Sequence, residues 1–138
     1  MDPKGTQLIV EFHRCQSAHL AHASDLEQIL ITAIPQAGLH QVRIVSHQFS
    51  PAGVTILAVI SESHVALHTY PEASHISLDI FTCSNPQRSW NLVDLLAAQL
   101  KPTDVDIMEV ERGEHPQICQ QTKRQTIYQQ NNNLNHNE

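Results

Sequence analysis

The chain has 138 residues, a length typical of one domain. Hydrophobic residues make up 41% of it and charged residues 16%, so it can bury a core of ordinary size and is not a disordered composition. Fourteen acidic residues against eight Lys and Arg give a formal net charge of -6. This balance argues against binding to nucleic acid or to an anionic membrane, because both need a cationic surface.

No stretch approaches the roughly 20 apolar residues that a membrane-spanning helix needs. The first residues lack the charged and then apolar pattern of a signal peptide. The three cysteines are odd in number and widely spaced, so they do not suggest a disulfide framework. We therefore expect a cytoplasmic protein. Ten histidines are the unusual feature of the composition.

The first predicted elements are a strand and a helix. Residues 6–13 alternate between apolar and polar side chains, as in a half-buried strand. A helix is predicted next, because Ser24 and Glu27 have the spacing of a capping box at a helix start. Pro35 and Gly38 then indicate its end.

A run of strands and a second helix follow. Four segments rich in β-branched residues are each predicted to be a strand, namely 40–50, 53–61, 64–70 and 75–82. A second helix is predicted from Asn85, which can cap it, to a stop at Pro102. Val105 and Ile107 alternate with polar residues in a last strand.

The predicted order is therefore β-α-β-β-β-β-α-β. Consecutive strands with such short joins pair antiparallel, because a parallel crossover needs a dozen or more residues. We expect an α+β fold, a two-layer α/β sandwich with a mainly antiparallel sheet and both helices on one face. The domain is expected to occupy residues 1–112, and the polar residues 113–138 are expected to form a mostly disordered tail.

Reactive side chains are densest between Thr55 and Cys83. Taken singly, each has an ordinary explanation. A pair such as Glu62–Ser63 occurs by chance in most proteins, and Ser63 lacks the Gly-x-Ser-x-Gly surroundings of a hydrolase nucleophile. His68 fits an exposed strand position, and Cys83 beside apolar residues fits a small buried hydrophobe.

The histidines raise the hypothesis of a metal site. His19 and His22 are three positions apart and can share one face of a helix, and His13 precedes them. Zinc sites usually need three or four ligands with cysteine or acidic partners, and neither Cys-x-x-Cys nor His-Glu-x-x-His is present. Other histidines are scattered along the chain, at His40, His47, His115 and His136. We therefore expect no metal cofactor, and a domain whose histidines bind metal remains an alternative.

Four ordered blocks carry more information together than their residues do singly. They are Phe49-Ser-Pro-Ala-Gly-Val-Thr55, Ile60-Ser-Glu-Ser-His64, His68-Thr-Tyr-Pro-Glu72 and Asp79-Ile-Phe-Thr-Cys83. With these blocks at this spacing, and with Val10-Glu11-Phe12 and Cys15 ahead of them, the chain resembles the small prokaryotic S-adenosylmethionine decarboxylases from about residue 6 to residue 110.

The resemblance implies an enzyme that makes a pyruvoyl cofactor from its own chain. In this family the precursor cuts itself at a Glu-Ser bond, here Glu62–Ser63, when the serine hydroxyl attacks the preceding carbonyl and converts the amide into an ester. β-Elimination and hydrolysis then leave a pyruvoyl group in place of Ser63. Its carbonyl forms a Schiff base with the substrate amine and draws in the electrons released with CO2, so no pyridoxal phosphate is required.

The resemblance also implies roles for three further residues. His68 matches the base that assists the elimination, and Cys83 matches the acid that returns a proton to the substrate. Thr55 matches a position usually filled by serine, whose hydroxyl supports the ester intermediate. Positions 63 and 68 differ by an odd number, so an ideal strand puts them on opposite faces. A bulge or the strand end at Ser63 must bring them together.

The implied substrate, S-adenosylmethionine, has its own matching residues. Phe49 matches an aromatic ring that stacks on adenine, and Glu72 matches a carboxylate that accepts hydrogen bonds from the ribose. Tyr70 stands where many members have Trp. Ser84 follows Cys83 where the family usually has Gly, a departure that matters if the turn needs a positive φ. The family's pocket is shared between two chains, which implies a homodimer of cleaved protomers.

The implied function is decarboxylation of S-adenosylmethionine, which gives the aminopropyl donor for spermidine. Besides the metal-binding domain considered above, two alternatives remain. One is a pyruvoyl-dependent ornithine or arginine decarboxylase on the same scaffold, although a small amino acid has no use for the contacts offered by Phe49 and Glu72. The other is an uncleaved, non-catalytic homologue. The joint presence of Glu62, Ser63, His68 and Cys83 argues against it.

Overall fold

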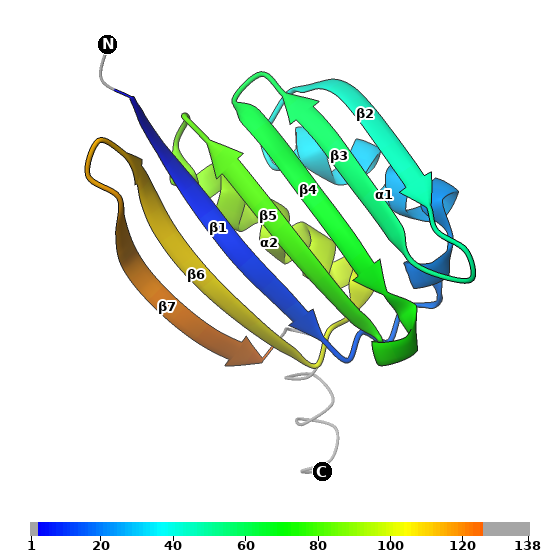
Figure 1. Cartoon of the computed structure of the whole chain (residues 1–138). Helices are drawn as coiled ribbons and strands as arrows, with labels where there is room; N and C mark the ends of the chain where they lie inside the picture. Colours follow the sequence, from blue (N-terminus) through cyan, green and yellow to red (C-terminus); the bar gives the residue numbers. More distant parts are fainter. Residues whose placement is uncertain (1–2, 126–138) are drawn as a thin grey trace.

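The computed structural model describes residues 3–125 as one antiparallel sheet and two α-helices (Figure 1). The strands are β1 (Lys4–His13), β2 (Gln41–Gln48), β3 (Val54–Ile60), β4 (Ser63–Tyr70), β5 (His75–Thr82), β6 (Asp104–Gly113) and β7 (Gln117–Gln125). The helices are α1 (Ala23–Gln36) and α2 (Pro86–Leu100), with short 3-10 turns η1 (Ala18–Ala21) and η2 (Pro71–Ala73). The sheet has seven strands in the spatial order β2-β3-β4-β5-β1-β6-β7. The predicted α+β sandwich is confirmed.

Both α-helices cover the same face of the sheet (Figure 1). Strand side chains alternate between that face and the opposite one, which we call the open face. In β5, for example, Ile76 and Leu78 are buried under the helices, whereas His75 and Ser77 are only partly buried on the open face. Within the described part of the chain, no helix has the length and apolar character needed to cross a membrane.

The core lies between the helices and the sheet. Leu26, Leu30 and Ile34 of α1 are buried at helical spacing, and Leu92 and Leu96 of α2 are fully buried beside them. Burying one such side chain contributes about 1.5–3 kcal/mol relative to leaving it in water. The hydrophobic pattern therefore fixes which face of the sheet is covered.

The start of α1 differs from the prediction. Ser24 lies inside the helix, and the N-cap is His22, whose side chain makes no capping hydrogen bond. The reason is that η1 leads directly into α1, so the first helical bond is accepted by the carbonyl of His22, 3.2 Å from the amide of Leu26. Pro35 lies within the last turn of the helix rather than beyond it.

The prediction of a disordered tail over residues 113–138 is wrong for β7. Residues 117–125 pair antiparallel with β6 at the edge of the sheet. An edge strand is held by backbone hydrogen bonds and can keep polar side chains in water, so its composition gives no hydrophobic pattern. Because β7 belongs to the sheet, the ordered domain extends past residue 112. Residues 126–138 of the predicted tail lie outside the described residues.

Candidate active site

The Glu62–Ser63 bond lies in the tight turn between β3 and β4. Ile60 pairs with Ser63, so Ser61 and Glu62 alone form the turn. Two-residue hairpin turns usually take positive φ at their central residues. Here neither Ser61 nor Glu62 does so, and Ser63 has a φ of 153° instead. Such a φ is unfavourable for any residue with a Cβ, so backbone strain falls on the residue that follows the bond.

Cys83 lies against this turn. Its backbone N–H donates a hydrogen bond of 3.0 Å to the carbonyl oxygen of Glu62, and the preceding residue, Thr82, pairs with Ser63 across β4 and β5. An N–H directed at this oxygen stabilises negative charge that develops on it. We refer to Glu62, Ser63 and Cys83 as the cleavage group.

A pocket of about 520 Å³ borders Cys83. The guanidinium of Arg112 lies 4.6 Å from the centre of the Phe81 ring and donates a hydrogen bond of 3.2 Å to Gln7 Oε1. Gly5 passes against the same ring, where a Cβ would lie 2.4 Å from a ring carbon. No sequence motif marks Arg112 as part of this pocket, because its position depends on β1 lying between β5 and β6.

The side chain of Glu62 is held by His40, in the loop between α1 and β2. The His40 backbone N–H donates to Glu62 Oε1 over 3.1 Å, and His40 Nδ1 lies 2.7 Å from Oε2. Arg88, a cation, has its Nη1 3.9 Å from the same Oε2 atom. Burial raises the pKa of Glu62, but the hydrogen bonds from the side chain and backbone of His40 outweigh it and hold this pKa below its usual value. In the sequence His40 is only one of several scattered histidines.

The other predicted residues gather at the opposite end of β4. His68 pairs with Thr55 across β3 and β4, and His68 Nδ1 lies 3.0 Å from Thr55 Oγ1. Phe49, half exposed, stands in the turn between β2 and β3. Tyr70 ends β4 and Glu72 follows it in η2, and both are exposed. We refer to these five residues as the histidine group.

The cleavage group and the histidine group do not meet within one chain. Five positions of extended strand separate Ser63 from His68, which is about 16 Å at 3.3 Å per residue. The register from Ser63 opposite Ile60 to His68 opposite Thr55 is unbroken. The expectation that a bulge or the strand end brings Ser63 and His68 together is therefore wrong within a single chain. Ser63 does stand at the strand end, but this changes its backbone angle and not its distance from His68.

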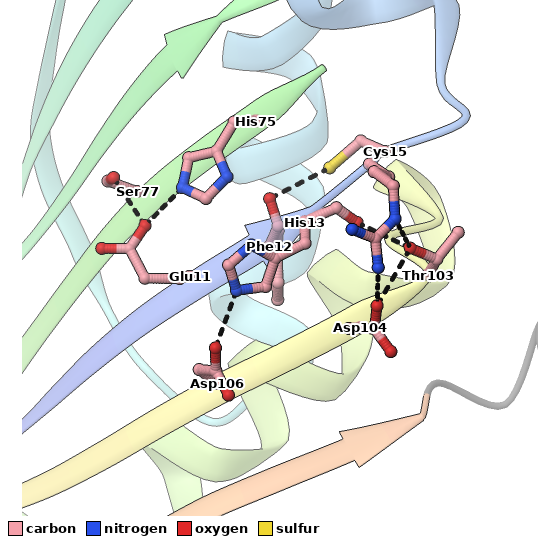
Figure 2. A network of polar contacts seen from close by, with 10 residues as sticks. Glu11, Phe12, His13, Cys15, His75, Ser77, Thr103, Asp104 and Asp106 are labelled. Atoms are coloured by element: carbon pink, nitrogen blue, oxygen red, sulfur yellow. Dashed lines mark hydrogen bonds and ion pairs between the residues drawn. The ribbon is translucent and has the colours of Figure 1, made fainter. Parts of the chain in front are cut away.

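Polar side chains of the open face bind one another beside the histidine group. Figure 2 shows Glu11 accepting a hydrogen bond of 2.7 Å from Ser77, with His75 Nε2 2.6 Å from the same oxygen. His13 contacts Asp106 over 2.8 Å, and its ring centre lies 5.0 Å from that of His75 (Figure 2). This network is adjacent to the histidine group, because Ser77 is the cross-strand partner of His68.

The histidines considered as metal ligands are not brought together. His13 contacts Asp106 on the open face, whereas His19 Nδ1 lies 3.3 Å from Asp25 near the start of α1. Over residues 3–125, no three or more His, Cys, Asp or Glu side chains are arranged to hold a metal ion. His136 lies outside the described residues.

The cysteines differ in their surroundings. Cys15 is buried, its Sγ lies 3.8 Å from the carbonyl oxygen of Phe12, and burial raises the pKa of its thiol to about 12. Cys83 and Cys119 are exposed, and all three are free thiols. Cys15 is therefore a core residue, and Cys83 is the accessible thiol next to the turn.

Ser84 needs no glycine-like backbone, because its φ is not positive. Its hydroxyl is instead buried, and it is the one buried side-chain polar atom of the described residues that has no hydrogen-bond partner. A buried polar group left without a partner costs about 1–3 kcal/mol.

Ser84→Ala is therefore expected to raise the free energy of unfolding by about 1 kcal/mol, since it removes the unpaired hydroxyl. Urea denaturation in a Ser63→Ala background measures this on an intact chain. Ser77→Ala is the matched control and should lower stability, because the Ser77 hydroxyl donates to Glu11. A loss of stability in Ser84→Ala would mean that this hydroxyl is satisfied in solution.

Comparison with known proteins gives a consistent result. Residues 6–113 match the family model described as S-adenosylmethionine decarboxylase. The chain is 34% identical over 113 residues to the S-adenosylmethionine decarboxylase proenzyme of Methanococcus maripaludis (strain C7), covering 82% of this chain and 93% of that one. It is 36% identical over 117 residues to the proenzyme of Moorella thermoacetica, covering 83% of this chain and 94% of the relative.

Solved structures are similar as well. The crystal structure of the adenosylmethionine decarboxylase from Aquifex aeolicus aligns with a TM-score of 0.76 at 25% identity, over 83% of this chain and 95% of that chain. The crystal structure of Trypanosoma brucei AdoMetDC-delta26 aligns with a TM-score of 0.59 at 15% identity, over 76% of this chain and 45% of that chain. At that identity the second likeness concerns the fold alone.

Proposed function

The chain belongs to the S-adenosylmethionine decarboxylase family, and we propose that it is a pyruvoyl-dependent decarboxylase of S-adenosylmethionine that cuts its own chain between Glu62 and Ser63. One observation carries the self-cleavage. The Cys83 N–H is directed at the Glu62 carbonyl oxygen in a turn whose next residue, Ser63, has a strained φ. The product would serve as the aminopropyl donor for spermidine.

The first step of processing moves the acyl group from nitrogen to oxygen. The Ser63 hydroxyl oxygen forms a bond to the Glu62 carbonyl carbon, the carbon–nitrogen bond breaks, and the nitrogen takes up the hydroxyl proton. The carbonyl oxygen carries negative charge during this step, and the Cys83 N–H, 3.0 Å away, stabilises it. Opening the peptide bond also releases the backbone strain at Ser63.

The second step is an elimination. A base removes the Cα proton of Ser63, the Cβ–Oγ bond breaks, and Glu62 leaves as a carboxylate. Hydrolysis then consumes one water and releases ammonia, which leaves the keto group. We assign the base to His68, whose Nδ1 is engaged by Thr55 Oγ1 at 3.0 Å. This contact orients the ring so that Nε2 is the nitrogen that takes the proton.

Because His68 lies about 16 Å from Ser63 in its own chain, we propose that a second copy supplies the histidine group. A twofold axis then forms two equivalent sites, each with the cleavage group of one protomer and the histidine group of its partner. The open face is the surface available for this contact, since helices cover the other face. It is apolar across β2 and β3, where Val45, Leu57 and Val59 are 58%, 51% and 49% exposed.

The substrate would bind between the two groups. The exposed ring of Phe49 can stack on adenine, which is worth about 1–3 kcal/mol, and Glu72 can accept hydrogen bonds from the ribose hydroxyls. Tyr70, which is exposed and lies between Phe49 and Glu72 in the sequence, would line the same site.

The pyruvoyl group at position 63 supplies a carbonyl that withdraws the electrons released with CO2. The exposed Cys83 thiol would return the proton. The three free thiols suit the reducing cytoplasm, where we expect the enzyme to act.

Decarboxylation assays together with intact-mass analysis test this function. Purified wild-type protein is expected to separate into fragments 1–62 and 63–138, the second with a borohydride-reducible ketone at its N-terminus. It should release labelled CO2 from S-adenosylmethionine and not from ornithine or arginine. Release of CO2 from ornithine or arginine, but not from S-adenosylmethionine, would overturn the assignment of the substrate. A whole chain that does not react with borohydride would overturn the cofactor.

Cys83→Ala is expected to be cut normally but to turn over at least about 100-fold more slowly, within the usual range for a lost general acid. Cutting survives because the contact with Glu62 is made by the backbone N–H, which alanine keeps. Fragment mass and CO2 release measure the two effects separately. Cys119→Ala, which changes the other exposed thiol, is the control and should remain active. Full activity in Cys83→Ala would remove its role as proton donor.

A further inference from the structure

His40 holds the β3–β4 turn through three hydrogen bonds. The Ser61 N–H donates 2.8 Å to the His40 carbonyl oxygen, the His40 N–H donates 3.1 Å to Glu62 Oε1, and the ring Nδ1 lies 2.7 Å from Oε2. Two of these contacts are made by the backbone of His40 and only one by its ring. The ring is 70% exposed, whereas the side chain of Glu62 is only 9% exposed.

The carboxylate of Glu62 is an electrostatic obstacle to self-cleavage unless it is compensated. The backbone carbonyl of Glu62 becomes negatively charged during the acyl shift. After the elimination it is a second carboxylate on the same residue. Two negative charges so close together repel each other, and water screens them weakly where the side chain is nearly buried. Partners that bind the carboxylate and fix its direction therefore lower the barrier.

We propose that the ring of His40 is a positioning residue for self-cleavage, because its hydrogen bond fixes the Glu62 carboxylate and stabilises the negative charge of that carboxylate while the adjacent carbonyl is attacked. Arg88, with Nη1 3.9 Å from Glu62 Oε2, is a weaker second partner for the same charge. This inference rests on the proposed cutting at Glu62–Ser63 and identifies what sets the rate of that reaction in this chain.

The test follows the cutting of newly made full-length chains in a reconstituted translation reaction. His40→Ala is expected to be cut about tenfold more slowly than wild type, the effect of losing one hydrogen bond to a charged group. The fold should persist, since the ring is exposed and alanine keeps both backbone contacts of position 40. Added imidazole should restore part of the rate by occupying the space of the ring. His19→Ala, which removes another exposed histidine paired with a carboxylate, is the matched control and should be cut at the wild-type rate.

A second variant separates charge compensation from a general loosening of the turn. In a Glu62→Gln background there is no carboxylate to offset, so His40→Ala should cause no further slowing. Cutting of His40→Ala at the wild-type rate would overturn the inference. A second result would also overturn it: His40→Ala is cut slowly, imidazole does not rescue it, and His40→Ala slows cutting by the same factor in the Glu62→Gln background. Wild type that is never cut would contradict the self-cleavage itself, which is a different result from either of these.

Discussion

Ser63→Ala is expected to remain a single uncut chain without decarboxylase activity. Alanine has no hydroxyl oxygen to attack the Glu62 carbonyl, so no ester forms and no keto group can arise at position 63. The loss of activity should be complete rather than partial, since the cofactor itself is missing. Intact-mass analysis after prolonged incubation and CO2 release from S-adenosylmethionine measure both consequences.

Ser61→Ala is the control, because it removes the hydroxyl on the other side of Glu62. Its backbone N–H still donates to the His40 carbonyl, so the turn is retained. This variant should be cut and active. Cutting of the Ser63→Ala chain between positions 62 and 63 would mean that another nucleophile opens the bond.

Chains carrying Ser63→Ala and chains carrying His68→Ala are expected to complement each other when they are produced together. Alone, the first has no nucleophile and the second has no base. In a mixed dimer, one of the two sites combines Ser63 of the His68→Ala chain with His68 of the Ser63→Ala chain. The His68→Ala chain should therefore be cut and gain activity, whereas the Ser63→Ala chain should stay whole. Different masses on the two chains let mass spectrometry identify which one is cut.

The double variant Ser63→Ala/His68→Ala provides the control for complementation. Paired with the His68→Ala chain, it offers no site that has both residues, so nothing should be cut. If the His68→Ala chain stays uncut beside the Ser63→Ala chain, the site does not extend across two copies. The approximately 16 Å between Ser63 and His68 would then have to close by a rearrangement within one chain.

The hydrophobic pattern was sufficient for the elements that have a buried face. Ile76, Leu78 and Ile80 repeat every second residue, and Leu26, Leu30 and Ile34 repeat at helical spacing, because one side of each element packs against the core. β7 has no such side. It is held by backbone pairing with β6 at the sheet edge, and a polar edge strand cannot be distinguished from a polar tail by composition.

The residues of the candidate site could be identified because four ordered blocks of the sequence resemble a known family, but their arrangement in space could not be predicted. Thr55 and His68 meet because of the register between β3 and β4, and Ser63 lies at the far end of the same ladder. His40 is brought to Glu62 by the loop after α1, twenty-two positions away, and no motif signals that contact. The odd spacing of positions 63 and 68 predicts only that they lie on opposite faces of a strand, whereas the distance along the strand separates them more strongly.

The strand order also decides what happens to the two pieces after the cut. The piece ending at Glu62 contains β1, and β1 lies between β5 and β6, which both belong to the piece beginning at Ser63. The pieces are thus interlocked within one sheet, and they cannot dissociate without breaking three ladders, including that between β3 and β4. Before the cut, folding is a unimolecular event. Afterwards two separate polypeptides must find each other again, so the recovery of unfolded enzyme depends on its concentration, and maturation makes the loss of structure hard to reverse in dilute solution.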